Sequence, residues 1–324
     1  MMKLVIIVIA LMITYILPSC GIYRSKMTIQ TFDKVEYNSD NIKYSPILWK
    51  SDSIGDNFIE KTALYIPVKL NGINKEVHMQ FDIGSPTTIL YGNTLEAFAE
   101  NNPSINGKIV KIEDQRTYFH GARLVLNNNI ALTAKKLPVI KYGSDFIDTS
   151  FSVIGSTGYD FIGDNILVLD FKTDKYALTD SLNRDLRKKV KYIDNPDLEK
   201  FPVILPFRFG NKKIRLMYDS GSSLFPVLTG TNRLNKLSRA TNIDTTFFGS
   251  LNSWGNQQKF YRIKDAKRIY FNEQNLGNID VYGCEDLNKL KLTGRYLYGI
   301  TGNRLFEDKT IIIDRKNNKF GIVE

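Results

Sequence analysis

Alternating apolar and polar residues predict β-strands along much of the chain. The first clear pair, 64–70 and Val77–Phe81, is separated by a short segment that begins with Asn-Gly, a dipeptide typical of tight hairpin turns. A second pair, 202–209 and 214–218, surrounds a Gly-Asn turn in the same way. The pattern predicts two similar β-hairpins in the two halves of a β-rich chain.

Helical patterns are few and short. One covers 94–100, where the side chain of Asn93 can cap the first turn. Another covers 180–189, and its basic C-terminal end suits the helix dipole. This second helix lies between the two hairpins, so we expect it to belong to the connection between two lobes.

The two hairpins belong to an internal repeat of about half the chain. An Asp-x-Gly-Ser motif ends each hairpin, with its acid at Asp82 and at Asp219. A glycine after apolar residues follows 81 residues later at Gly163, and 83 residues later at Gly302. Each glycine leads into an apolar stretch, an Asp, a charged turn and a last strand. One such motif is expected by chance in about one protein in ten of this length, but two at matched spacing indicate two related lobes.

Two aspartates that meet between such lobes could hydrolyse an amide bond. Carboxylates within about 3 Å of each other cannot both ionise comfortably, so they share one proton. The charged member can then deprotonate a water while the protonated member hydrogen-bonds the carbonyl oxygen. Because the proton belongs to the pair, the sequence assigns no fixed role to Asp82 or Asp219. This chemistry needs neither a metal nor a covalent intermediate, and we expect no cofactor.

The residues after each aspartate fit this chemistry. Gly84 and Gly221 permit a tight loop in which backbone amides approach the carboxylate. Ser85 and Ser222 can each donate a hydrogen bond to the outer carboxylate oxygen.

Here the sequence resembles a known family. The stretches Phe-Asp-Ile-Gly-Ser (81–85) and Tyr-Asp-Ser-Gly-Ser (218–222) are similar to the paired signature loops of pepsin-like and retropepsin-like aspartic proteases. Phe-Ile-Gly (161–163) and Ile-Thr-Gly (300–302) resemble the second half of that motif. The resemblance, which covers roughly 62–324, implies an all-β, bilobal pepsin-like fold. Its two related β-barrel-like lobes would have pseudo-twofold symmetry, with an extended cleft between them.

The same resemblance implies an aspartic endopeptidase, with a peptide or protein as its partner and Asp82 and Asp219 as its catalytic residues. In the family, the residue after each aspartate is normally Thr or Ser, and its hydroxyl interlocks with the other lobe. Ser220 keeps that hydroxyl, whereas Ile83 cannot supply one. Losing one buried hydrogen bond costs about 1–3 kcal/mol when a partner is left unsatisfied. The departure leaves an alternative open, a non-catalytic peptide- or glycan-binding lipoprotein with a degenerate protease fold.

The family also has a mobile hairpin over the cleft that often carries a tyrosine. Tyr118, which lies 36 residues after Asp82 and shortly before Gly121, is the candidate for this flap. An ordinary strand aromatic is the alternative.

The N-terminus carries a targeting signal. Lys3 precedes an apolar run at 4–17, which is too short for a permanent membrane helix and suits a signal-peptide core. The run is followed by Pro-Ser and Cys20, a pattern that resembles the bacterial lipoprotein cleavage site. Cys20 would then be lipidated, and the membrane would be a partner through this anchor. An ordinary signal peptide and an uncleaved anchor are the alternatives.

These patterns divide the chain into four parts. We expect a signal peptide at 1–19, a lipidated tether at 20–45, an N-terminal lobe at 46–190 and a C-terminal lobe at 191–324. The expected location is the bacterial cell envelope, facing the periplasm or the exterior.

Composition narrows the chemistry further. With 43% apolar and 24% charged residues the chain is typical of a globular protein. Two His and two Cys exclude most zinc sites and a disulfide scaffold, and we expect Cys284 to be a small buried residue rather than a nucleophile. The net charge of +10 comes from dispersed basic residues, which predicts a solvated basic surface and no nucleic-acid partner.

Overall fold

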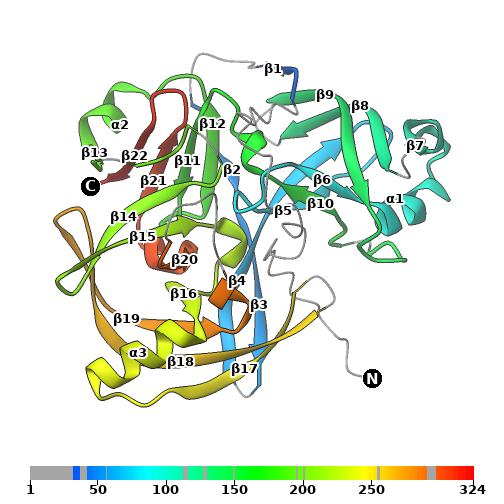
Figure 1. Ribbon diagram of the computed structural model, residues 1–324. Helices are drawn as coiled ribbons and strands as arrows, with labels where there is room; N and C mark the ends of the chain where they lie inside the picture. The colour runs from blue at the N-terminus through cyan, green and yellow to red at the C-terminus, as the bar shows by residue number, and fades with distance from the viewer. Residues whose placement is uncertain are drawn as a thin grey trace, which may run out of the picture.

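The computed structural model describes residues 32–36, 42–55, 57–111, 116–126, 130–148, 150–194, 196–199, 201–253, 256–289 and 297–324. Within these ranges the strands form three sheets, of nine, six and seven strands (Figure 1). The described chain is therefore dominated by β-structure, as the alternating pattern predicts.

The nine-stranded sheet builds the N-terminal lobe. Its strands follow the order β1-β9-β6-β10-β5-β4-β8-β7, and β3 pairs with β4 outside this path. Short helices α1, η1 and η2 connect or follow these strands. The elements are β1 (Lys34–Glu36), β3 (Leu48–Ile54), β4 (Asn57–Leu70), β5 (Val77–Phe81), β6 (Ile89–Tyr91), α1 (Gly92–Ala99), η1 (Pro103–Lys108), β7 (Ile109–Lys111), β8 (Thr117–Leu126), β9 (Ala131–Ile140), β10 (Val153–Thr157) and η2 (Tyr159–Phe161).

The seven-stranded sheet builds the C-terminal lobe in the order β14-β15-β20-β16-β19-β18-β17. The helix α3 follows β16 in the same way that α1 follows β6. The elements are β14 (Ile204–Phe209), β15 (Lys212–Tyr218), η3 (Ser220–Ser222), β16 (Val227–Gly230), α3 (Thr231–Thr241), β17 (Thr246–Ser253), β18 (Asn256–Phe271), β19 (Gln274–Cys284), η4 (Asp286–Lys289), β20 (Gly299–Thr301) and η5 (Asn303–Phe306).

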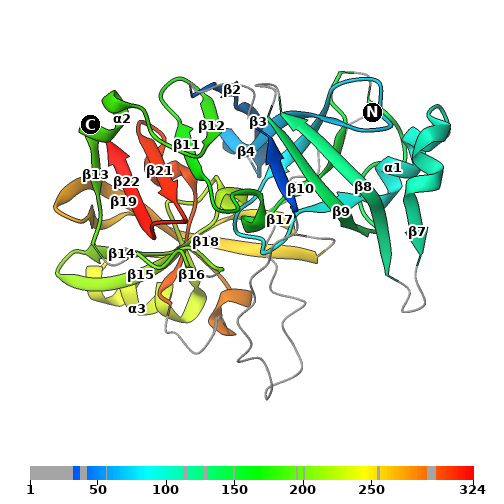
Figure 2. The same cartoon turned by 90° about the horizontal axis from the view of Figure 1, so that it is seen from above.

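The six-stranded sheet joins the two lobes. Its order is β13-β22-β21-β11-β12-β2, so three strands from the C-terminal half of the chain lie beside three strands from the N-terminal half. At its centre β11 and β21 run antiparallel, and Leu167 faces Ile313 across the seam. In Figure 2 the strands β11, β12, β21 and β22 lie together, with the N-terminal strands β8 and β9 beyond them. The elements are β2 (Ser45–Pro46), β11 (Ile166–Asp170), β12 (Lys175–Thr179), α2 (Arg184–Lys189), β13 (Val190–Tyr192), β21 (Thr310–Asp314) and β22 (Lys319–Val323).

The predicted hairpins are confirmed, and the predicted helices need correction at their starts. β4 pairs with β5, and β14 pairs with β15. α1 begins two residues earlier than predicted, after Tyr91, and no side chain caps it, so Asn93 is not its cap. α2 begins later than predicted because the side chain of Asn183 accepts a hydrogen bond from the Leu186 amide (2.9 Å) and sets its first turn.

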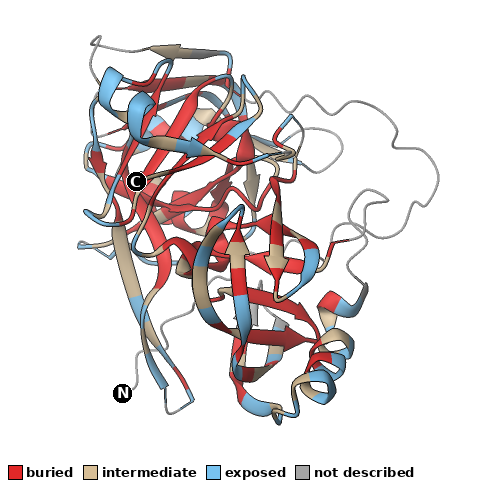
Figure 3. Ribbon diagram, turned by 90° about the vertical axis from the view of Figure 1, so that its left-hand side faces the viewer, coloured by how far each residue is buried: buried red, intermediate tan, exposed pale blue. Residues whose placement is uncertain are grey.

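Buried residues, red in the ribbon of Figure 3, lie in the interior of both lobes. The residue before each catalytic candidate is a fully buried aromatic in both halves. The Phe81 ring packs edge-on against Phe161 at 5.6 Å, and the Tyr218 ring packs edge-on against Phe306 at 5.7 Å. Each aspartate is therefore attached to a strand that is fixed in a packed core.

A long hairpin of the N-terminal lobe also reaches the C-terminal lobe. In Figure 1 β3 and β4 run down beside β17. Ile54, near the hairpin tip, belongs to a hydrophobic cluster that otherwise consists of C-terminal-lobe residues such as Phe248 and Leu251.

A groove of about 870 Å³ lies between this tip and the C-terminal lobe. The residues that line it are Asn57, Phe58, Ile59, Glu60, Leu224, Pro226, Phe248, Arg262, Leu276, Asn278, Ile279, Asp280, Tyr282, Arg304, Leu305, Glu307 and Asp308.

Part of the expected tether lies within the described ranges. There β1 pairs with β9 of the N-terminal lobe, and Ser45 of β2 pairs with Tyr176 in the joining sheet. The expected boundary between the lobes, at 190 and 191, falls inside β13. No helix within the described ranges is long and apolar enough to cross a membrane. Residues 1–31, with Cys20 and the expected signal peptide, lie outside those ranges.

Candidate active site

Each aspartate directly follows a strand that has a paired neighbour on both sides. Asp82 follows β5, which runs parallel to β10, and Asp219 follows β15, which runs parallel to β20. The Asp82 amide donates to Thr157 Oγ1 (3.2 Å), and the Asp219 amide donates to the Thr301 carbonyl (2.9 Å). Both loops are thus anchored to a threonine at the end of the neighbouring parallel strand.

This pairing corrects one element of the predicted repeat. The counterpart of Gly302 is Gly158, which directly follows β10, and not Gly163. Gly158 and Gly302 both precede a short 3-10 helix and both have extended backbones, whereas Gly163 has a φ of 56° after its helix. From these glycines to Asp170 and to Asp314 the spacing is 12 residues in both lobes, so the five-residue insertion implied by Gly163 disappears.

The two aspartate loops meet face to face. A Cβ added to Gly84 would overlap Asp219 Oδ1. A Cβ added to Gly221 would lie 2.7 Å from Asp82 Oδ1 and 3.1 Å from Asp219 Oδ1. Only glycine leaves room for the opposing carboxyl group at these two positions, so the structure brings the acids together as predicted.

One hydroxyl ties the loops across the lobes. The Ile83 amide donates to Ser220 Oγ (2.9 Å), and Ser220 Oγ donates to the Phe81 carbonyl (2.8 Å). Ser220 therefore holds the backbone on both sides of Asp82. The side chain of Ile83 has no exposed surface and lies in the main hydrophobic core. The interlock is consequently one-sided, as the Ile at this position predicts.

We expect Ser220→Ala to lower the free energy of unfolding by about 1–3 kcal/mol, because the Ile83 amide and the Phe81 carbonyl lose a buried partner. Urea unfolding of wild type and variant measures the loss. Ser220→Thr, which keeps the hydroxyl, is the matched control and should recover most of it. An unchanged midpoint in Ser220→Ala would show that this hydroxyl does not hold the lobes together.

The two carboxyl groups have unequal hydrogen-bond partners. Asp219 accepts from the Gly221 amide (2.9 Å) and, as predicted, from Ser222 Oγ (2.8 Å). Within the described chain, no hydrogen bond of ordinary geometry reaches either Asp82 oxygen, although the Gly84 and Ser85 amides lie close enough to lower the Asp82 pKa. The Ser85 hydroxyl, expected to bind Asp82, donates instead to the Thr87 carbonyl (3.1 Å). The prediction is confirmed for Ser222, and the structure differs from it at Ser85.

Burial has the largest effect on the pKa values of both aspartates. Asp82 has no exposed surface and Asp219 has 1%. Burial, then the neighbouring Asp219 charge and a hydrogen bond with its carboxyl group, raise the pKa of Asp82 well above its usual value, while the Gly84 and Ser85 amides lower it. Burial also raises the pKa of Asp219, against the lowering effect of Ser222, of Asp82 and of the loop amides.

This burial predicts that the pair destabilises the fold as the pH rises. In the unfolded chain a carboxyl ionises near pH 4, but in the folded protein the pKa of Asp82 is higher. The contribution of the pair is full below the unfolded pKa and is lost as the pH rises through the folded pKa of Asp82. The free energy of unfolding of wild type should therefore fall as the pH rises above about 4, relative to Asp82→Asn. Urea unfolding at several pH values measures this difference, which stays constant if the expectation is wrong.

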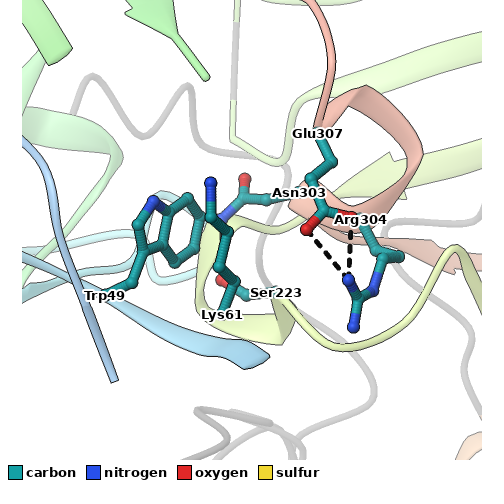
Figure 4. A pocket seen from close by; sticks show the side chains of 6 residues that line it. All are labelled: Trp49, Lys61, Ser223, Asn303, Arg304 and Glu307. Atoms are coloured by element: carbon teal, nitrogen blue, oxygen red, sulfur yellow. Dashed lines mark hydrogen bonds and ion pairs between the residues drawn. The ribbon is translucent and has the colours of Figure 1, made fainter. Parts of the chain in front are cut away.

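A polar network that the sequence analysis missed supports the Asp219 loop. Tyr218 Oη donates to Asn303 Oδ1 (2.6 Å), and Asn303 Nδ2 donates to the Ser220 carbonyl (3.0 Å) and to Ser223 Oγ (2.7 Å). Asn303 and Ser223 line a small pocket of about 10 Å³. Figure 4 shows the other residues that line it, Trp49, Lys61, Arg304 and Glu307. The sequence offered one signal for this residue, since Asn303 immediately follows Gly302, the glycine of the second repeat.

The structure places the flap candidate in the β7–β8 hairpin, between β7 and β9. Tyr118 lies on β8 opposite Val110 of β7, and the Lys136 ammonium lies 4.6 Å from its ring centre. The contacts that the structure describes for Tyr118 do not include Asp82 or Asp219. The tip of this hairpin, 112–115, lies outside the described residues, so the flap role stays a prediction.

Cys284 is buried, as predicted, and burial raises the pKa of its thiol to about 11. A thiol that stays protonated at neutral pH is a poor nucleophile. In the described part of the chain, no group of three or more His, Cys, Asp or Glu side chains could hold a metal ion.

Neither the protein-family models nor the curated proteins that were compared match this sequence. Solved structures do match: the chain is similar to the crystal structure of aspartic proteinase from Irpex lacteus, with a TM-score of 0.50 and 13% sequence identity. The similarity covers 87% of this chain and 97% of that chain. The fold is that of a pepsin-like aspartic proteinase. The predicted fold class is therefore confirmed, and within the pepsin-like fold the paired loops lie at the junction of the two lobes.

Proposed function

We propose that the protein is an aspartic endopeptidase that hydrolyses peptide bonds with a water activated by Asp82 and Asp219. The observation that carries the proposal is the meeting of these two buried acids in matched loops, each closed by a glycine with no room for a side chain. The pepsin-like fold supports the proposal at the level of architecture.

The environment suits this chemistry. Two buried carboxyl groups that face each other can share one proton, and burial raises the pKa of both Asp82 and Asp219. The pair then offers one base for a water and one acid for the carbonyl oxygen at the same place. Hydrolysis without a metal ion needs this base and this acid at the same peptide bond.

The test is hydrolysis of an unfolded protein or a peptide library, combined with binding of a statine-type peptide. The statine hydroxyl mimics the tetrahedral species, so a catalytic dyad binds it far more tightly than a matched peptide without that hydroxyl. We expect both cleavage and this preference. Equal binding of the two peptides together with no cleavage would overturn the proposal.

Ile83 favours a second candidate function, a non-catalytic peptide- or glycan-binding protein with the same fold. The side chain supplies no hydroxyl to the opposite lobe and fills the core with hydrocarbon instead. A binder of this kind retains peptides or glycans without cleaving them and does not distinguish statine from its matched peptide.

We also propose that the chain is a lipoprotein of the bacterial cell envelope, anchored through Cys20 after removal of 1–19 and facing the periplasm or the exterior. The apolar run before Cys20 supports this location. Growth with radiolabelled palmitate should label the wild-type protein, and Cys20→Ala should abolish the label. Equal labelling of both proteins would contradict the anchor.

A further inference from the structure

We propose that the helix α2 carries a cationic face that binds an anionic lipid surface. The cationic face consists of Arg184, Arg187, Lys188 and Lys189. The inference rests on the proposed location in the cell envelope, and it adds an electrostatic contact to the proposed lipid anchor.

Basic residues are concentrated in α2 and at the start of the strand that follows it. Five of the eight residues at 184–191 are basic, and Asp185 is the one acid among them. All four side chains of the cationic face are exposed. No residue that the structure describes forms an ion pair with these four, whereas Lys61, Arg262 and Arg304 each pair with a carboxylate. The described chain therefore leaves the charge of this helix open to an outside partner.

The helix turns these cations away from the protein. Leu186 packs against a cluster of apolar residues on one face of the six-stranded sheet, which includes Ile166 and Val168. Because a helix has 3.6 residues per turn, Arg184 and Lys188 lie on the side of α2 opposite Leu186. These two like charges are also neighbours at positions i and i+4, where they repel each other. An anionic surface outside the helix would relieve this repulsion.

The two aspartate loops lie beyond the other face of the same sheet. The ring of Phe81 lies 6.0 Å from that of Tyr176 on β12, and the ring of Tyr218 lies 6.1 Å from that of Phe320 on β22. Tyr176 and Phe320 belong to the main core, on the face of the sheet opposite Leu186. The sheet thus separates α2 from the proposed catalytic pair, and a membrane bound at α2 does not cover that pair.

The N-terminal part of the described chain reaches the same side as α2. Ile42 packs against the same apolar cluster as Leu186. In Figure 1 β1 lies at the top of the molecule, as α2 does. Both segments follow the proposed anchor at Cys20 in the sequence. A lipid chain together with a basic patch holds a protein on a membrane more firmly than one lipid chain alone.

The chemistry of the cationic face suits lipid headgroups. Each Lys or Arg near a negatively charged membrane strengthens binding by a factor of about five. None of the four side chains is buried, so they suit the averaged charge of many headgroups better than one fixed phosphate. Attraction of this kind is screened by salt.

The experiment measures binding of the full chain to vesicles of phosphatidylcholine, with and without anionic phosphatidylglycerol. Every protein carries Cys20→Ala so that no lipid is attached, and the apolar run at 4–17 acts alike on both kinds of vesicle. The face variant combines Arg184→Gln, Arg187→Gln, Lys188→Gln and Lys189→Gln. The control variant removes the same charge from exposed residues of the C-terminal lobe, with Lys212→Gln, Lys213→Gln, Lys267→Gln and Arg268→Gln.

We expect the protein with the intact face to prefer anionic vesicles at about 0.1 M salt and to lose the preference at about 1 M. The face variant should bind anionic vesicles about 100-fold more weakly, and the control variant should stay within about fivefold of the protein with the intact face. Lys188→Glu alone, which changes the charge by two, should weaken binding about 20-fold. Equal urea midpoints show that each variant is folded, and Lys188→Glu decides the test if the fourfold variant is not.

An absence of preference for anionic vesicles, or equal losses in the face and control variants, would overturn the inference. Labelling with palmitate separates this inference from the proposed anchor. A labelled protein without the preference would retain the anchor and reject the cationic face, whereas an unlabelled protein with the preference would do the reverse. Vesicle binding requires no peptidase activity, so its outcome does not depend on the proposed catalytic pair.

Discussion

Replacing Asp82 or Asp219 by Asn is expected to lower kcat/KM for peptide hydrolysis by a factor of about 10,000 or more. Asn has nearly the shape of Asp, but it neither takes a proton from water nor donates an acidic proton to the substrate. Because the two acids act as one pair, either single variant should lose about as much activity as the double variant. Initial rates on an unfolded protein or a fluorogenic peptide measure the loss.

The control for this prediction is Asp244→Asn, a change at an exposed acid of the C-terminal lobe, which should keep wild-type activity. Stability provides a second check. At neutral pH, Asp82→Asn removes a carboxyl group whose ionisation is disfavoured by burial and by the facing Asp219, so this variant should unfold at a urea concentration no lower than wild type. Wild-type activity in either dyad variant would rule out the mechanism, and a loss of activity accompanied by unfolding would move the test to Asp82→Glu, which keeps the acid and displaces it.

Gly84→Ala is expected to reduce activity at least about 100-fold and to destabilise the fold by about 1–3 kcal/mol. The added methyl group would overlap Asp219 Oδ1, and this atom belongs to a carboxyl group already fixed by hydrogen bonds to the Gly221 amide and to Ser222. The carboxyl group or the loop must therefore move out of the geometry that the pair requires. Rates and urea unfolding on the same preparation separate the two effects.

Gly107→Ala is the matched control, because Gly107 is exposed in η1 and an added Cβ meets no atom within 4 Å. We expect activity unchanged and stability within about 0.5 kcal/mol of wild type. If Gly84→Ala behaves like Gly107→Ala, the two loops do not approach each other as closely as the structure indicates.

The strands and the two acids could be predicted because short-range patterns determine them. Alternating apolar and polar residues predict the hairpins β4–β5 and β14–β15. The glycine two residues after each aspartate permits a tight loop, which indicates where each strand ends. The repeat of that motif was sufficient to predict that Asp82 and Asp219 converge, since related halves place equivalent residues about a twofold axis.

The pairing of strands that lie far apart in the sequence was harder to predict. Gly163 directly follows two apolar residues, whereas Gly158 follows Ser156 and Thr157, and the apolar pattern alone favours Gly163 as the end of the strand beside Asp82. The parallel pairing of β10 with β5 decides for Gly158, because Thr157 lies opposite Phe81. A contact between strands that are more than 70 residues apart has no local signal.

Side-chain direction could not be predicted either. Ser85 and Ser222 occupy matched positions in the sequence, yet one hydroxyl bonds a carbonyl of its own loop and the other bonds the aspartate. The support from Asn303 and the reach of the hairpin β3–β4 onto the C-terminal lobe depend on packing between distant segments in the same way. These features decide how the dyad is tuned, and they follow only from the three-dimensional arrangement.

The most direct test of the account is a crystal structure of the protein with a statine-type peptide bound. The account predicts that the statine hydroxyl lies within hydrogen-bond distance, about 2.5–3.2 Å, of a carboxyl oxygen of Asp82 and of Asp219 at once. Carboxyl groups too far apart for one hydroxyl to reach both, or a peptide bound elsewhere on the molecule, would contradict it.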